Sequence, residues 1–205
     1  MKNILIYTKT GTFHRHKEIN RISEESGLIL FFILFLCGML IGCAVYKSEI
    51  DRGDTWMQSA AEFFLAKSAL HYFISACFLS VFTILCSTFA SCSCFGLLIL
   101  FWLPMTEAFY FALQSCYLLE HYAVTGLGYF SLIILPSAVL QVTASLYLYA
   151  GCLRHTKALT SAIMEHSAFE SDWPAFFKHV AVCSSMILAS AFLRWGCAHL
   201  FGPLF

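Results

Sequence analysis

The sequence predicts an all-α, polytopic integral membrane protein with five transmembrane helices. Three observations lead to this class: long apolar runs fill more than half of the chain, no charge cluster interrupts them, and charged residues are few. Of the 205 residues, 60% are hydrophobic and 12% are charged, whereas about a quarter of the residues of a soluble domain are charged. These proportions exclude a soluble globular domain.

Each apolar run holds roughly 20 apolar or small residues, enough to cross a hydrocarbon core about 30 Å thick as a helix. Lipid offers no partners to backbone amides and carbonyls, so a spanning segment must satisfy them within itself, which an α-helix does. The predicted spans lie at about Leu28–Tyr46, Ala69–Ala90, Phe95–Leu119, Leu127–Leu153 and Val180–Phe201.

The first span follows a polar segment, residues 1–26, that is too long and too mixed for an ordinary signal peptide. Basic residues gather in this segment and again between the fourth and fifth spans, and such residues favour the cytoplasmic face. We therefore expect a cytoplasmic amino terminus and a five-helix membrane domain over residues 27–205. The basic residues behind this expectation are Lys2, Lys9, Arg15, Lys17, Arg21, Arg154, Lys157 and Lys178.

Within the first span, Gly38 and Gly42 form a small-xxx-small motif that lets another helix approach closely. The neighbour is either another span of this chain or a second protein. The loop that follows, Lys47–Lys67, is the only sizeable segment on the outer face in this topology. Its Trp56, Phe63 and Phe64 suggest a short interfacial helix, which either docks a partner protein or anchors the next span.

A tight hairpin at Ser91–Cys94 makes the second and third spans antiparallel neighbours. Eight of the ten cysteines lie inside or at the rim of the apolar runs, where we interpret them as small hydrophobic residues. Cys92 and Cys94 form a C-x-C without a second ligand pair, so a metal site is not expected. Pro136 in the fourth span, like Pro104 in the third, is interpreted as a helix-packing and bending feature.

Glu107 lies near the middle of the third span, where an ionised carboxylate is costly unless it has a partner. Arg194 in the fifth span lies at a similar depth and is the expected partner, and Gln141 in the fourth span is placed to form a hydrogen bond with Glu107. Two interpretations remain open. The group either fixes helix packing or couples to protons or a substrate.

No nucleophile elbow, phosphate-binding loop or zinc-protease motif occurs, and the eight histidines show no ligand spacing. We therefore expect no catalytic residue, no cofactor and no enzymatic activity. The formal net charge is zero, so nucleic acid is not an expected partner. The expected partners are the lipid bilayer and other membrane or extracytoplasmic proteins.

The order of these features resembles the stage II sporulation protein M family over about residues 25–155. The matching stretches are Phe31–Gly42, the hairpin from His71 to Trp102, and Gly126–Gly128 followed by Ile133–Gln141 with its proline. One departure is the third span, where the family tends to have glycine-containing sequence and this chain reads Pro104–Phe109. That difference argues against close helix packing there.

The resemblance implies a non-enzymatic scaffold in the inner membrane of a bacterium. Such a scaffold recruits cell-wall hydrolases, the sporulation proteins D and P, to remodel septal peptidoglycan during engulfment. The alternative function is the membrane subunit of a transporter or an ATP-driven exporter, in which Glu107, Gln141 and Arg194 would line a polar path. The two functions predict opposite effects of a Glu107 substitution on flux.

Overall fold

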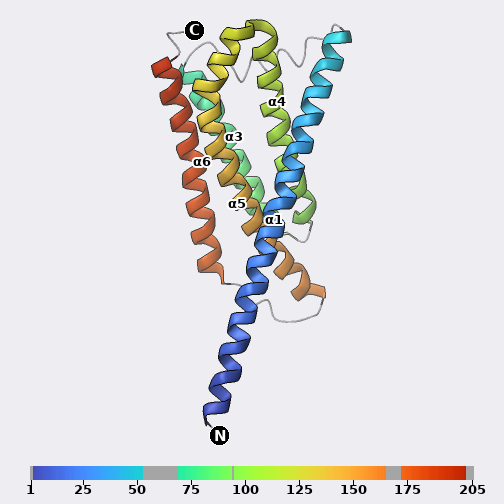
Figure 1. The fold of residues 1–205 in the computed structure, drawn as a ribbon, viewed down its shortest axis with the longest axis vertical. Coiled ribbons are helices and arrows are strands. Elements are labelled where there is room, and N and C mark those ends of the chain that lie inside the picture. The colour runs from blue at the N-terminus through green and yellow to red at the C-terminus, as the bar shows by residue number, and fades with distance from the viewer. Residues whose placement is uncertain (1, 53–68, 94, 165–171, 202–205) are drawn as a thin grey trace.

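A computed structural model describes residues 2–52, 69–93, 95–164 and 172–201, which form helices and short turns without a strand (Figure 1). The all-helical class is therefore confirmed for this part of the chain. The elements are α1 (Lys2–Arg52), α3 (Ala69–Ser91), α4 (Gly96–Tyr129), the π-helical turn η1 (Phe130–Ile134), α5 (Leu135–Met164) and α6 (Trp173–Phe201).

Four helical stretches of the described chain are long and apolar enough to cross a membrane, which is compatible with a membrane protein. They are Ser26–Asp51, Phe73–Ser91, Gly96–Met164 and Trp173–Phe201. This count does not match the five separate spans that the sequence predicts. The difference arises because the third and fourth predicted spans belong to one stretch of 69 residues, in which α4, η1 and α5 follow one another and the backbone departs from helical geometry at Ala123.

This long stretch reverses its direction at Ala123, whose φ of 45° and ψ of −118° depart from helical geometry. Gly126 permits the tight return, because a Cβ there would clash with the carbonyl oxygen of Leu118 and lie 3.0 Å from the Cβ of Tyr122. Figure 1 shows α4 leading up to this turn and α5 returning beside it. The two arms therefore form a helical hairpin without an intervening loop.

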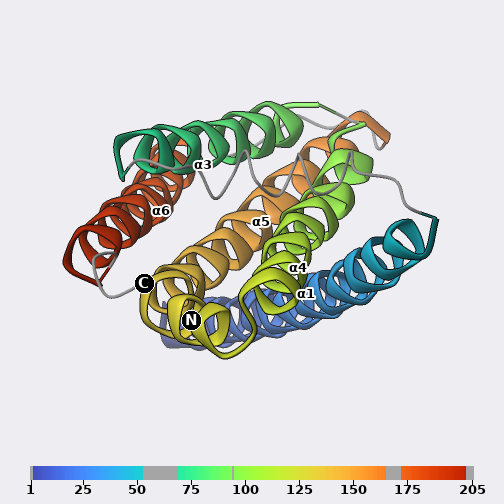
Figure 2. The same cartoon turned by 90° about the horizontal axis from the view of Figure 1, so that it is seen from above.

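Helices α4 and α5 form the middle layer of the bundle (Figure 2). Helix α1 covers one side and packs mainly against α4, while α3 and α6 pack together on the other side. The end of α1, the α4–α5 turn and the end of α6 lie at one end of the bundle (Figure 1). The α3–α4 turn and the start of α6 lie toward the other end.

The main core forms where α1, α3, α4, α5 and α6 meet. Phe31, Leu100, Leu148 and Ile187 have no exposed surface, and the Tyr149 ring is 1% exposed. The outer surface is also apolar: large side chains such as Phe78, Phe89, Leu98 and Trp102 are exposed. A soluble monomer rarely exposes so much continuous apolar surface, whereas lipid solvates it without cost.

Helix α1 approaches α4 closely at its two glycines. A Cβ on Gly38 would clash with the Met105 carbonyl oxygen, and a Cβ on Gly42 would lie 2.8 Å from the Cβ of Ala112. The neighbour of the small-xxx-small motif in this structure is thus α4 of the same chain. The expectation against close packing around Pro104–Phe109 was wrong, because the glycines that allow the approach are supplied by α1 and meet alanines of α4.

Candidate functional site

The candidate site is a polar cluster around Glu107, a residue of α4 that is only 8% exposed. Its Oε1 accepts hydrogen bonds from Gln141 Nε2 at 2.9 Å and from Ser145 Oγ at 3.2 Å. Its Oε2 accepts a hydrogen bond from the Tyr149 hydroxyl at 3.0 Å. The bond from Gln141 is the one that the sequence led us to expect. All three donors belong to α5.

The three donors lie on one face of α5 because they follow one another at intervals of four residues. Sequence analysis identified Gln141 but missed Ser145 and Tyr149. The spacing was the available signal: a polar residue every fourth position in an otherwise apolar helix marks a stripe that must face a polar partner. Glu107 is that partner on the adjacent arm of the hairpin.

A carboxylate has about four lone-pair positions, so three donors satisfy most of its hydrogen-bonding capacity. Such a group is expensive in an apolar interior when its oxygens lack partners. In this site both oxygens have partners from α5, and the hydrogen bonds gain strength from the low surrounding dielectric. The cluster therefore joins α4 to α5 by polar contacts along the middle of the hairpin.

The structure joins Arg194, which the sequence analysis paired with Glu107, to a different residue of α4. Its Nη2 donates a hydrogen bond to Oε1 of Gln114 at 2.9 Å. Gln114 is buried and lies seven residues beyond Glu107, which is about 10 Å along a helix. The sequence analysis placed Arg194 at a depth similar to that of Glu107, whereas the structure bonds it to Gln114, about two turns further along α4.

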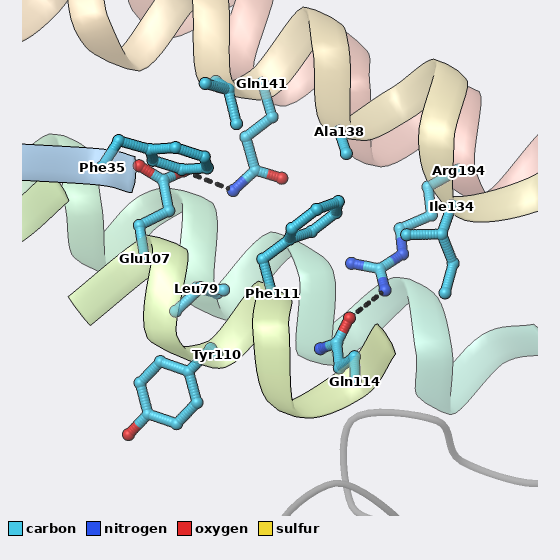
Figure 3. A pocket seen from close by; sticks show the side chains of 11 residues that line it. Phe35, Leu79, Glu107, Tyr110, Phe111, Gln114, Ile134, Ala138, Gln141 and Arg194 are labelled. Carbon is cyan, nitrogen blue, oxygen red and sulfur yellow. Dashed lines mark hydrogen bonds between the residues drawn. The ribbon is translucent and has the colours of Figure 1, made fainter. Parts of the chain in front are cut away.

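A small pocket lies between these two polar contacts (Figure 3). Glu107 and Gln141 are at one end, Gln114 and Arg194 are at the other, and the Phe111 ring lies between them. The pocket is large enough to hold one or two water molecules.

Two further polar contacts hold helices together near the ends of the bundle. At the end of α1, the Tyr46 hydroxyl donates to Oε2 of Glu120 at 2.6 Å. At the other end, the Nδ1 of His155 lies 3.2 Å from the carbonyl oxygen of Ser91, and its ring packs on Phe176. Sequence analysis did not identify these contacts, because residues far apart in an apolar chain carry no local sign of their pairing.

The remaining predicted residues are two prolines in described helices and three aromatic residues outside the described part of the chain. Pro136 lies at the start of α5, directly after the π-helical turn, and Pro104 lies buried inside α4. Trp56, Phe63 and Phe64, the candidate partner-binding residues, lie outside the described residues.

Within the described parts of the chain, no three His, Cys, Asp or Glu side chains are placed to hold a metal ion. Comparison with known proteins identifies no relative: no family model matches the chain, and neither a curated protein nor a solved structure is significantly similar to it. The candidate site is therefore interpreted from its own geometry.

Proposed function

We propose that this chain is a non-enzymatic membrane platform that holds partner proteins at the membrane. The observation that carries the proposal is the hydrogen bonding of the Glu107 carboxylate. Its carboxylate accepts hydrogen bonds from three side chains of α5, and the pocket beside it is small. A polar group that is satisfied within the bundle acts as a helix connector, whereas a transport path needs polar groups that are open to a substrate.

The partner class follows from the resemblance to the stage II sporulation protein M family, which implies peptidoglycan hydrolases that act outside the bacterial inner membrane. The Lys47–Lys67 loop, with Trp56, Phe63 and Phe64, is the proposed docking segment. This assignment rests on the residues of the loop and on its length.

The proposed topology has five crossings with the amino terminus in the cytoplasm. Two observations support it: the long stretch Gly96–Met164 reverses at Ala123, and Glu107 on its first arm contacts Tyr149 on its second. Each arm can then cross the membrane once. The basic residues of segment 1–26 and of the region between α5 and α6 would lie on the same, cytoplasmic face.

The proposal is tested by cross-linking the tagged full-length protein in its native membrane and identifying the proteins that purify with it. We expect peptidoglycan hydrolases with the unaltered chain and their loss from a triple variant, Trp56→Ala, Phe63→Ala and Phe64→Ala. A matched control changes one tryptophan and two phenylalanines that are exposed elsewhere, Trp102, Phe89 and Phe95. This control should still recover the hydrolases.

A nucleotide-binding ATPase in place of hydrolases would contradict the platform and favour an exporter. A second measurement separates the two functions directly. Vesicles that contain the purified protein and an internal pH-sensitive dye should show no more proton flux than protein-free vesicles. Flux through the unaltered chain that is lost in Glu107→Gln would show that the platform proposal is wrong.

A further inference from the structure

The structure brings two thiols together that lie 73 positions apart in the chain. Cys43 of α1 and Cys116 of α4 have their sulfur atoms 3.6 Å apart. Both are free thiols; Cys43 is exposed and Cys116 is partly buried. The sequence analysis interpreted both as small hydrophobic residues, because nothing local in either helix indicates that they meet.

Close packing holds the two thiols near each other from both sides. Directly before Cys43, Gly42 allows the backbone of α1 to approach α4, since a Cβ there would lie 2.9 Å from the carbonyl oxygen of Phe109. One turn after Cys43, Tyr46 is bonded to Glu120, and Glu120 lies one turn after Cys116. The sulfur contact therefore lies between two points at which α1 and α4 are already fixed to each other.

We propose that Cys43 and Cys116 are a redox-responsive pair that oxidation joins into a disulfide between α1 and α4. A disulfide needs its sulfurs about 2.05 Å apart, so the two atoms must approach by about 1.5 Å. Rotation of the two side chains about χ1 is the natural movement, because the backbones are held by the flanking contacts. The proposal concerns a modification site and does not depend on the platform function.

Oxidation of the pair by molecular oxygen balances as follows. Each thiol gives up its proton and one electron, and the S–S bond forms between the two sulfurs. One oxygen molecule accepts both electrons and both protons and becomes hydrogen peroxide. A reducing thiol such as dithiothreitol reverses the modification by thiol–disulfide exchange, in which its own sulfurs become oxidised.

The consequence is a covalent link between the helix that covers one side of the bundle and the middle layer. The link closes a loop of more than seventy residues, from Cys43 to Cys116, and long loops lose the most chain entropy in the unfolded state when they are closed. The oxidised protein should therefore resist unfolding better than the reduced protein. It should also hold α1 in place against α4.

The test uses the full-length protein in native membranes, with dissolved oxygen and the membrane-permeant catalyst copper–phenanthroline. Remaining thiols are blocked with N-ethylmaleimide in denaturant, and the digested peptides are identified by mass spectrometry with and without dithiothreitol. We expect a linked peptide containing Cys43 and Cys116 that dithiothreitol abolishes, and loss of the N-ethylmaleimide label from both residues.

The Cys43→Ser variant is the matched control, because it keeps Cys37, another exposed thiol on the same helix. In this variant Cys116 should remain labelled after oxidation. The proposal is overturned if Cys43 and Cys116 both stay labelled in the oxidised unaltered protein. It is equally overturned if either is joined to a different cysteine or to a second copy of the chain.

Discussion

The hydroxyl of Tyr149 donates a hydrogen bond to Oε2 of Glu107 at 3.0 Å and joins two buried residues 42 positions apart. This bond, with those from Gln141 and Ser145, holds the two arms of the α4–α5 hairpin in register. Because all three bonds meet on one carboxylate, a change at Glu107 removes the acceptor of three donors at once.

Glu107→Ala should lower the free energy of unfolding by about 2–4 kcal/mol, since it leaves three donors, two of them buried, without their acceptor and creates a cavity. Glu107→Gln should cost less, because the amide keeps the volume and one acceptor oxygen. Unfolding in detergent, followed by tryptophan fluorescence, measures both. Equal stability of Glu107→Ala and the unaltered protein would contradict the role of Glu107 as a helix connector.

Gly38→Ala should destabilise the α1–α4 contact by about 1–3 kcal/mol, because the added Cβ meets the backbone of Met105, which cannot rotate away. Gly196→Ala provides the control, since a Cβ at Gly196 has nothing within 4 Å. That variant should be neutral or up to about 1 kcal/mol more stable, as alanine favours helix more than glycine does. The same unfolding assay compares the two. Similar losses of stability in the two variants would argue against the close approach of α1 to α4.

The bond between Arg194 and Gln114 should appear as coupling in a double-mutant cycle. Gln114→Leu should cost about 1–3 kcal/mol, because the Arg194 guanidinium loses a buried acceptor. In the background of Arg194→Met, the same change should cost less, with a coupling energy of at least about 0.5 kcal/mol. Costs that simply add in the double variant would show that the two side chains do not interact.

Ala123→Gly should stabilise the hairpin by about 1 kcal/mol. Ala123 has a φ of 45°, a conformation that strains an L-residue and that glycine adopts freely. Ala181→Gly, an exposed position inside α6, is the matched control and should cost about 1 kcal/mol instead. Thermal unfolding of both variants measures whether each substitution raises or lowers the stability. A loss of stability in Ala123→Gly would contradict a reversal at this residue.

Much of the site could be predicted from single residues. Glu107 was found because a carboxylate in an apolar run is conspicuous, and Gln141 because its depth matched. Ser145 and Tyr149 were missed although their four-residue spacing from Gln141 was visible. The acceptor of Arg194 was assigned to Glu107, because a depth estimate along α4 cannot distinguish it from Gln114 two turns further on.

The sequence by itself determined that the described chain is helical and that its exterior is apolar. Both are properties of each segment alone, since a run of about 20 apolar residues must satisfy its backbone internally wherever it lies. Only the tertiary structure decided which faces meet: Gly38 on Met105, Tyr149 on Glu107, and Cys43 on Cys116. These contacts depend on the rotation and crossing of whole helices, which lipid leaves free and which close packing and interhelical hydrogen bonds select.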